Sequence, residues 1–406
     1  MPVFRAERAA PSLRLTLQLW AGVLLLYGLL IVRGGIHTGP DTQSYSHWAD
    51  QLIAHRFNPV SFLRQESFTA PLVFYTGWIT VVAVMKTALG SGWMNGVLIL
   101  NWLSIGAGSH RILSVVRDAT ASASSQILAA LLLCCSAELL IFAPFVLSDV
   151  AFWALASAGI AAGCTVAIAE SDSGRRFPAR TAAIGLTVVL IAFTFRPVAA
   201  PLLVFWAAAV ACWFGRRLVD RFATALMTTI AVLALAAIAW HAYVLIHPEA
   251  WPIGKLPDIL ALLASEYRHG VLVYAPESNF MVEPATTWLA AMRLTAQKLI
   301  FFLTPWLPYY SPVHTVLNLA FFIPAYGLPI AALVNRSRLA QPQQRVVVVL
   351  FIYAVCLTVF HATMMIDYDH RYRLPLLPAL ITLAAIGLEA LRRPQSLGLR
   401  PGIDRT

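Results

Sequence analysis

Residues 19–32 read LWAGVLLLYGLLIV, and a polar stretch, GPDTQSYSHWAD, follows at residues 39–50. The apolar run lies within a segment, about residues 15–33, that is long enough to cross roughly 30 Å of hydrocarbon as a helix. The polar stretch therefore begins where the first predicted membrane span ends. Its Asp41 is a carboxylate at the mouth of a membrane bundle, and we expect it to take part in chemistry at the water–lipid boundary.

The rest of the chain is equally apolar. The 406 residues are 59% hydrophobic and 12% charged, whereas an ordinary soluble protein is about 25% charged. We expect a single all-α, polytopic helical membrane domain over residues 1–406. Arg5, Arg8 and Arg14 precede the first span and no small-residue cleavage site follows it, so it is interpreted as a retained anchor rather than a removed signal peptide.

Cysteine spacing and charge distribution exclude two other classes. The five cysteines lie in apolar segments without paired spacing, which favours packing thiols over a disulfide framework or a zinc site. The net charge of +10 alone would be compatible with a nucleic-acid partner. However, the basic residues form short clusters between apolar runs, such as Arg392/Arg393, and this is the positive-inside pattern of membrane proteins.

The number of spans follows from hydropathy combined with charge. Hydropathy alone gives about twelve helices, but strict alternation would place several arginine clusters outside. The conflict disappears if residues 71–89 and 290–307 enter the membrane without crossing it, so we expect ten to twelve spans. The ten are about 15–33, 93–113, 125–144, 149–169, 181–196, 198–214, 222–246, 313–334, 346–364 and 374–391. Both termini and the net positive charge then lie on the cytoplasmic side.

Two large outer loops result, at residues 34–92 and 247–312. The first is expected to contain the membrane-dipping segment and an amphipathic helix from Asp41 to His55. One apolar stripe on that helix comprises Tyr45, Trp48, Ala49, Leu52 and Ile53. Such a stripe predicts a helix lying on the membrane surface. The second loop is rich in Trp and Tyr, which favours an interfacial belt, with a groove for an isoprenoid chain or a sugar as the alternative.

Ionisable residues near a bilayer are costly unless they are partnered, so each is a candidate functional residue. The predicted outer side gathers Asp41 with Asp50, Asp149, Arg196, Lys298, and the run Asp367-Tyr368-Asp369-His370-Arg371-Tyr372-Arg373. Carboxylates mixed with guanidinium groups suit a reaction that needs both a base and an anion-holding pocket. Arginine matches phosphate well because its planar fork can donate two parallel hydrogen bonds.

Four motifs carry a resemblance to a known family. They are GPDxxxYxxxA at residues 39–49, LSD at 147–149, FRP at 195–197 and DHRYRLP at 369–375. In this order and spacing, over about residues 15–391, the chain resembles the GT-C membrane glycosyltransferases. The likeness is to the bacterial family 39-like branch, related to dolichyl-phosphate-mannose protein mannosyltransferases and the lipid A aminoarabinose transferase. It implies a GT-C-like fold with surface helices in the first outer loop.

The resemblance implies an inverting transferase on the outer face of the bacterial cytoplasmic membrane. The sugar donor would be a polyprenyl-phosphate sugar, and the acceptor an envelope lipid, glycan or protein. Asp41 matches the family's general base, and Arg196, Arg371 and Arg373 would hold the departing phosphate. The other substrate-binding candidates are Lys298, Asp149, Asp369, Tyr45 and His370. Two departures stand out: Thr42 follows Asp41 where many relatives have a second acid, and residues 69–72 read TAPL without their double proline.

Blander alternatives stay open at this point. Asp41 after Gly-Pro could be a helix N-cap, Asp149 and Glu138 could be structural hydrogen-bonding groups, and the arginines could anchor the interface. No cofactor is required. A divalent metal on the three histidines of residues 37–55, or on Asp367 and Asp369, is the weaker alternative. The competing function is a transporter or flippase, although transporters usually place polar groups at mid-membrane in repeated broken helices.

Overall fold

The computed structural model describes residues 13–65, 70–120, 122–169, 178–213, 287–306, 310–364 and 370–393. Within these ranges the chain is helical, with one isolated bridge between His37 and Phe145. The α-helices are α1 (Leu13–Gly34), α2 (Pro40–Ala54), α3 (Pro59–Gln65), α4 (Ala70–Leu89), α5 (Trp93–Thr120), α6 (Ala123–Cys135), α7 (Ala137–Phe142), α8 (Asp149–Ile168), α9 (Ala179–Phe193), α10 (Ala200–Trp213), α13 (Trp288–Leu303), α14 (Pro312–Val334), α15 (Gln341–Met364) and α16 (Leu377–Arg392). The 3-10 helices are η1 (Gly90–Gly92), η2 (Pro197–Ala199), η3 (Arg336–Arg338) and η4 (His370–Leu376).

Helix length and composition confirm the prediction of an all-α membrane protein. In the described part of the chain, five helices are long and apolar enough to cross a membrane: Leu13–Gly34, Asp149–Ile168, Pro312–Val334, Gln341–Ala362 and Arg371–Arg392. Three shorter apolar helices are Ala123–Cys135, Ala179–Phe193 and Pro197–Trp213. The span expected at residues 222–246 lies outside the described residues, and the total of ten to twelve spans stays a prediction.

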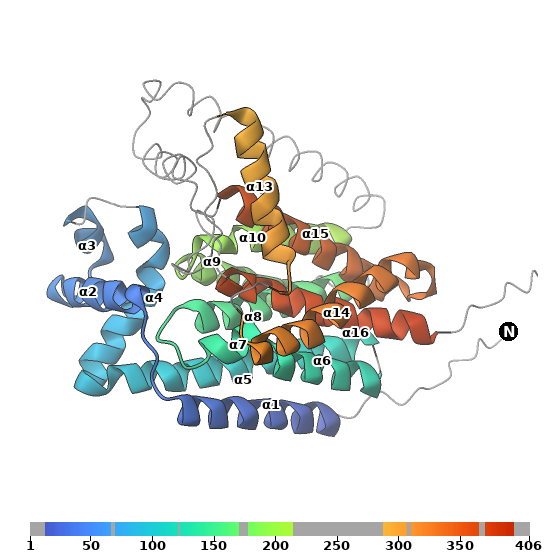
Figure 1. The fold of residues 1–406 in the computed structure, drawn as a ribbon, viewed down its shortest axis with the longest axis horizontal. Helices are drawn as coiled ribbons and strands as arrows, with labels where there is room; N and C mark the ends of the chain where they lie inside the picture. The colour runs from blue at the N-terminus through green and yellow to red at the C-terminus, as the bar shows by residue number, and fades with distance from the viewer. Residues whose placement is uncertain are drawn as a thin grey trace, which may run out of the picture.

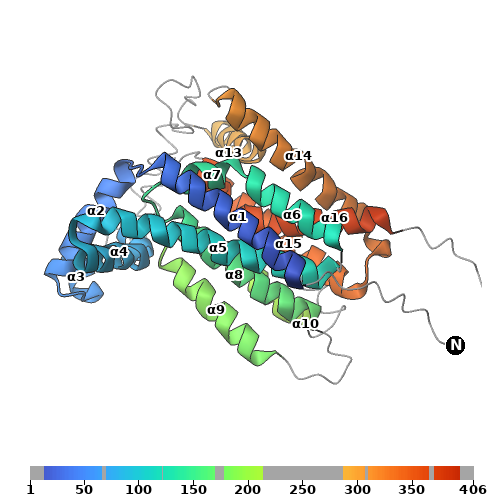
Figure 2. The same cartoon turned by 90° about the horizontal axis from the view of Figure 1, so that it is seen from below.

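The helices form an elongated bundle with a small lobe at one end (Figures 1 and 2). Helices α1, α5, α8, α14 and α16 run along the long axis, and α2, α3 and α4 make up the lobe. Helix α16 is central, because 89% of the apolar stretch that contains it is buried inside the protein. The buried share of α1 is only 22%, so α1 is peripheral. The outer side of α1 exposes large apolar side chains such as Leu25, Leu29 and Val32, as expected for a face in contact with lipid.

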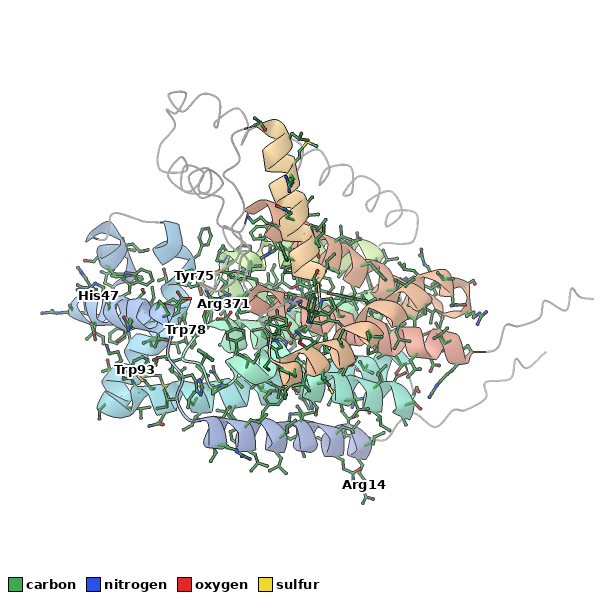
Figure 3. All side chains as sticks on the ribbon, viewed as in Figure 1. Arg14, His47, Tyr75, Trp78, Trp93 and Arg371 are labelled. Atoms are coloured by element: carbon green, nitrogen blue, oxygen red, sulfur yellow. The ribbon has the colours of Figure 1, made fainter. Side chains whose placement is uncertain are left out.

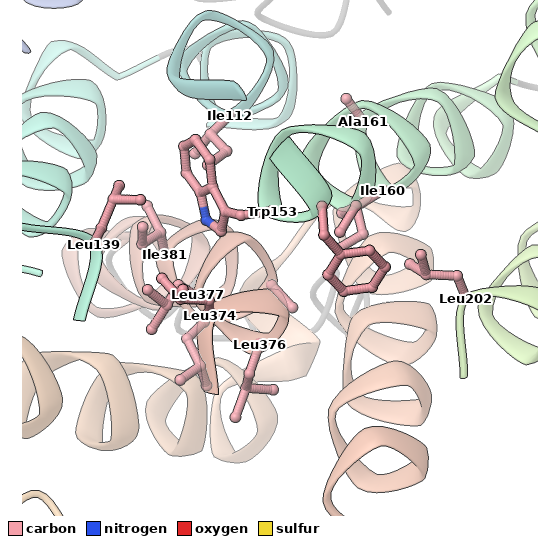
Figure 4. Packing of buried hydrophobic residues seen from close by; sticks show 14 of the residues in the cluster. Ile112, Leu139, Trp153, Ile160, Ala161, Leu202, Leu374, Leu376, Leu377 and Ile381 are labelled. Atoms are coloured by element: carbon pink, nitrogen blue, oxygen red, sulfur yellow. The ribbon is translucent and has the colours of Figure 1, made fainter. Parts of the chain in front are cut away.

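Small residues and hydrogen bonds hold the bundle together. Figure 4 shows Trp153 of α8 packed with Ile112 of α5 in the bundle core. A Cβ on Gly387 of α16 would collide with the backbone carbonyl of Leu328 in α14, so this close helix approach requires glycine. The hydroxyl of Ser125 in α6 also donates to the carbonyl of Ala385 in α16 at 3.0 Å. Such side chain-to-backbone bonds add to helix association where water is absent.

The predicted span at 125–144 is not one helix. Helix α6 ends at Cys135, Ser136 adopts an extended conformation, and α7 begins at Ala137. The Ser136 hydroxyl accepts a hydrogen bond from the backbone N–H of Leu139, which is the N-cap contact that starts a new helix. The break gives α7 a new start, and Glu138 in its first turn is completely buried.

The lobe shows what covers part of the predicted amphipathic helix. Tyr45, Ala49 and Leu52 are 4%, 0% and 1% exposed, because this stripe of α2 packs against α4. These three residues of the stripe are therefore covered by protein, whereas Trp48 and Ile53 are partly exposed, and the position of α2 at the membrane surface stays a prediction. Lys86 of α4 also reaches α2, where its ammonium lies 2.5 Å from the carboxylate of Asp50 and donates to the hydroxyl of Ser46 at 3.0 Å.

Candidate active site

Asp41 lies at the start of α2 with its carboxylate free of any capping role. The N-cap is Gly39, whose backbone N–H donates to the hydroxyl of Thr42 at 3.1 Å. The same hydroxyl donates to the carbonyl of Val146 at 3.1 Å. The side chain at the helix cap is thus that of Thr42, and not that of Asp41 as in the N-cap alternative. The Asp41 carboxylate is left for other partners.

The start of α2 is bonded to the segment that leads into α8. The backbone N–H of His37 donates to the carbonyl of Pro144, and that of Val146 donates to the carbonyl of His37, both at 3.0 Å. The side-chain amide of Asn101 donates to the carbonyl of Phe145 at 2.8 Å from the other side. These bonds fix Asp41 relative to Asp149, which begins α8.

Asp41 forms an ion pair with Arg371 from a distant part of the chain. The two residues are separated by 330 positions, and Nη1 of Arg371 donates to Oδ2 of Asp41 at 2.6 Å. The Asp41 side chain is 40% exposed and that of Arg371 is 15% exposed. An approaching molecule can therefore reach both the carboxylate and part of the guanidinium.

Tyr372 lies between two guanidinium groups. The Cζ of Arg371 lies 5.4 Å from the centre of the Tyr372 ring, and the Cζ of Arg196 lies 5.6 Å from it. Both distances are within the range of cation–π attraction, which is about 6 Å. The ring therefore connects the exposed pair at Asp41 to the buried arginine after α9.

Arg196 is held by α8 in a nearly water-free position. Its Nη2 donates to Oδ2 of Asp149 at 2.9 Å, its Nη1 lies 2.8 Å from Oδ1 of the same carboxylate, and its Nε donates to the hydroxyl of Ser148 at 3.0 Å. The side chains of the two charged residues are 3% and 1% exposed. This two-pronged contact is the strong form of an arginine–carboxylate pair, and it is compatible with the alternative that Asp149 is a structural group.

Arg373 has the deepest position of the predicted arginines. Its Nη2 lies 2.6 Å from Oε1 of Glu138, and both side chains are 0% exposed. It also donates to the carbonyl of Thr304 at 2.6 Å and to the hydroxyl of Tyr310 at 3.0 Å. The guanidinium lies over the ring of Phe322 at 4.8 Å. These partners join α7, η4, α14 and the end of α13.

Aromatic rings line the junction between the lobe and the bundle. Tyr45 lies 5.6 Å from Tyr75 and 6.4 Å from Trp78, ring centre to ring centre, and Trp78 lies 6.0 Å from Phe195. Figure 3 shows Tyr75, Trp78 and Arg371 in this region. Burial raises the pKa of Tyr45 far above its usual range, and the neighbouring Tyr75 and Asp41 raise it further. Its hydroxyl therefore stays protonated, so it can donate a hydrogen bond but cannot act as a base near neutral pH.

A close contact of α4 with the end of α9 keeps the aromatic rings of α4 next to Arg196. The backbone N–H of Gly77 in α4 donates to the carbonyl of Thr194 at 2.7 Å, two residues before Arg196. A Cβ at Gly77 would lie against the Thr194 hydroxyl and within 2.9 Å of the Thr194 carbonyl oxygen. Only glycine allows α4 to approach this closely.

The remaining predicted residues lie elsewhere or outside the described residues. Lys298 of α13 is 1% exposed. Within the described residues, the ion pairs of Asp41 and Asp50 are with Arg371 and Lys86, not with Lys298. His370 begins η4, and its side chain is outside the described residues, as are Asp369 and residues 247–286 of the second outer loop. Three further residues of this region contact the site without having been given a role from the sequence. Thr42 stood out only as a departure from the family pattern and Tyr372 only as part of the run at residues 367–373, whereas Tyr75 had no signal in the sequence.

The described residues contain no group of three or more His, Cys, Asp and Glu side chains placed to hold a metal ion. The ring of His37 instead bonds the carbonyl of Gly34 at 3.0 Å, and that of His55 bonds the hydroxyl of Ser61 at 2.9 Å. The histidine alternative for a metal therefore has no support from this geometry.

Comparison with known proteins gives no relative. No protein-family model matches the chain, and neither a curated protein nor a solved structure matches it. The fold and the site define a helical membrane protein with an accessible carboxylate–arginine pair at one end of its bundle.

Proposed function

We propose that the protein is an inverting glycosyltransferase that moves a sugar from a polyprenyl-phosphate carrier to an acceptor hydroxyl. The observation that carries the proposal is the Asp41–Arg371 pair, with its 2.6 Å contact and partial exposure. It joins an acid that can accept a proton to a cation that can bind phosphate. The resemblance of four ordered motifs to the GT-C transferases supports the same assignment.

In this proposal Asp41 is the general base. The acceptor hydroxyl transfers its proton to the carboxylate while its oxygen attacks the anomeric carbon from the face opposite the phosphate. The bond from the anomeric carbon to the phosphate oxygen breaks, and its electron pair leaves with the polyprenyl phosphate. Configuration at the anomeric carbon is inverted because one displacement occurs.

Arg371 is the group that contacts the phosphate. The donor phosphodiester has one negative charge, and a second negative charge develops as the sugar leaves. A guanidinium placed at that phosphate stabilises the transition state more than the ground state. The ion pair with Asp41 is then the donor-free state, in which the two groups neutralise each other. A bound phosphate shares Arg371 and releases the carboxylate for the acceptor.

In this proposal the other two arginines do not contact the donor phosphate directly, and they position the groups around it. Arg196 and Arg373 are 3% and 0% exposed, and each is bonded to a buried acid. Arg196 positions Arg371 through the ring of Tyr372. Arg373 holds η4 to α7 through Glu138. The sequence analysis expected all three arginines to hold the phosphate, whereas we now propose this role for Arg371 alone.

We place this site on the outer face of a bacterial cytoplasmic membrane, with ten to twelve spans and both termini inside. The basis is the concentration of arginine clusters in the loops on the opposite side, which orients membrane proteins. The donor is a lipid-linked sugar and the acceptor an envelope lipid, glycan or protein.

The test uses the purified protein in lipid nanodiscs with a panel of polyprenyl-phosphate sugars and acceptors, with products identified by mass spectrometry. We expect Asp41→Asn to lower the transfer rate about 100- to 10,000-fold, the usual contribution of a general base. Asp50→Asn is the matched control, because Asp50 lies on the same helix and pairs with Lys86. Normal transfer by Asp41→Asn would rule out the general-base role. Substrate crossing the membrane without any sugar transfer would favour a transporter instead.

A further inference from the structure

The opposite end of the bundle carries an arginine cluster of its own. Helix α5 starts beside the lobe and ends at Thr120, and the side-chain amide of Gln343 at the start of α15 donates to the carbonyl of Ala119 at 2.7 Å. The link between α14 and α15 therefore lies at the end of the bundle away from α2, the helix that begins with Asp41 in its first turn (Figures 1 and 2). We define the cluster by the arginines on the elements that meet at this link: Arg336 and Arg338 of η3, Arg345 in the second turn of α15, and Arg393 just after α16.

The backbone folds tightly around this link. Residues 336–338 form η3, and the N–H of Ala340 donates to the side chain of Gln343 at 2.9 Å. Arg393, just after α16, donates to the carbonyl of Arg338 at 3.3 Å. The ends of α14 and α16 and the start of α15 thus meet at one place.

Arg345 is buried, and no acid in the described part of the chain pairs with it. It is 9% exposed, and its Nη1 is buried with no hydrogen-bond partner in the described part of the chain. The Nε of Arg336 is likewise buried and unbonded. A guanidinium removed from water is strongly destabilising unless an anion and hydrogen bonds compensate it. The buried guanidinium groups of Arg345 and Arg336 therefore need an anion that the described residues do not supply.

The nearby carboxylates are already engaged. Asp118, at the end of α5, lies 2.8 Å from Nη2 of Arg117. Glu389 of α16 lies 3.1 Å from Nε of Arg393. Moreover, Arg345 lies near the N-terminus of α15, where the helix dipole already favours a negative charge. Counting only the residues that the structure describes, the cluster has an excess of positive charge that nearby acids do not neutralise.

Apolar side chains adjoin the cluster on the lipid side. The last turns of α14 lead directly into Arg336 and expose Ile330, Leu333 and Val334, which are 59%, 44% and 77% exposed. A ligand that fits both features has a phosphate for the arginines and hydrocarbon chains for α14. A small inorganic anion would satisfy only the first feature.

We propose that this cluster binds the headgroup phosphate of an anionic phospholipid. The phosphate accepts hydrogen bonds from Arg345 and Arg336, and the acyl chains lie along the exposed face of α14. Basic sites between membrane helices bind anionic lipids in this way. The proposal depends on the chain being a membrane protein and is independent of the proposed transferase activity.

The test measures thermal unfolding and retained lipid in native mass spectrometry for the full chain in neutral detergent. Phosphatidylglycerol, phosphatidylcholine or inorganic phosphate is added to separate samples. We expect phosphatidylglycerol alone to raise the melting temperature and to stay bound. Arg345→Gln should lower the affinity for phosphatidylglycerol about tenfold, as expected for the loss of one charge-assisted hydrogen bond. Arg392→Gln, an exposed arginine at the same end, should bind as the wild type does.

Each other outcome overturns the proposal. Equal stabilisation by phosphatidylcholine would remove the role of charge, and equal stabilisation by inorganic phosphate would make the ligand a free anion. Unchanged binding by Arg345→Gln would remove the site from this cluster. The lipid-free Arg345→Gln protein should be at least as stable as the wild type, since an uncompensated charge is removed. If that variant does not fold, Arg336→Gln decides by the same lipid-binding measurement.

Discussion

Arg371 and Arg373 stand two positions apart in η4 and bind acids in opposite settings. Arg371 holds the 40% exposed Asp41 at 2.6 Å, whereas Arg373 holds the completely buried Glu138 at the same distance. One short helix therefore presents one arginine to the surface of the site and anchors itself in the bundle with the other. This division predicts that the two arginines affect different properties.

Replacing Arg371 should reduce sugar transfer without unfolding the protein. We expect Arg371→Gln to lower kcat/KM for the lipid-linked donor about 10- to 100-fold, because one charge-assisted contact to phosphate is lost. Arg371→Lys should recover only part of this loss, since lysine lacks the planar fork. Arg33→Gln, an exposed arginine at the end of α1, is the control. Steady-state kinetics at varied donor concentration provides the measurement, and a wild-type kcat/KM in Arg371→Gln would contradict the phosphate role.

Replacing one member of the Arg373–Glu138 pair should instead reduce stability. Glu138→Ala leaves a buried guanidinium without its acid, which typically costs about 3–5 kcal/mol. The double variant Glu138→Leu/Arg373→Met removes both charges and should recover most of that loss. Denaturant unfolding in detergent, arranged as a double-mutant cycle, measures the difference. If the double variant is as unstable as Glu138→Ala, charge isolation is not the cause.

Tyr372 should act through its ring and not through its hydroxyl. The ring lies between Arg371 and Arg196 at 5.4 and 5.6 Å, and a phenyl ring supports the same cation–π attraction. We therefore expect Tyr372→Phe to keep near wild-type transfer and Tyr372→Leu to raise KM for the donor. Kinetics of the two variants compared side by side tests this. An equal loss in both would assign the effect to the hydroxyl.

The sequence predicts which residues share an end of the bundle, but not how they pair. Charge distribution and motif order brought Asp41 and Arg371 to one side, and the structure joins them. The partnership of Arg373 with Glu138 was not predictable, because it depends on the helix break at Ser136, and a single serine in an apolar run carries no clear signal. Pairing needs tertiary geometry that residue spacing does not contain.

The amphipathic helix shows the same limit in another form. Periodicity correctly identified Tyr45, Ala49 and Leu52 as one apolar stripe of α2. It could not say whether lipid or protein covers that stripe, because both are apolar surroundings. The covering helix α4 contributes Lys86, which pairs with Asp50 on α2. Neither this ion pair nor the cover that α4 provides could be read from the periodicity of α2 alone.

The contacts of Thr42 bear on the position where many members of the family that the chain resembles have a second acid. Thr42 is 2% exposed, and its hydroxyl accepts a hydrogen bond from the backbone N–H of Gly39 and donates one to the carbonyl of Val146. A carboxylate at this position would face the carbonyl of Val146, so restoring a second acid by Thr42→Asp should destabilise the start of α2. We expect a loss of about 1–3 kcal/mol, the cost of leaving buried polar groups unpaired. Thr42→Ser keeps the hydroxyl and is the control, with both variants measured by thermal unfolding.

Gly77 tests whether the lobe must touch the bundle for the site to work. A methyl group at Gly77 would lie against the Thr194 hydroxyl and its backbone carbonyl, and backbone yields less readily than a flexible side chain. Gly77→Ala should therefore push α4 away from the segment that carries Arg196 and lower sugar transfer. Gly22→Ala is the matched control, because nothing lies within 4 Å of a Cβ there. As a helix-interior glycine, Gly22 should gain about 0.5–1 kcal/mol of stability on replacement by alanine. Full transfer activity in Gly77→Ala would mean that the lobe can separate from α9 without disturbing the Asp41–Arg371 pair.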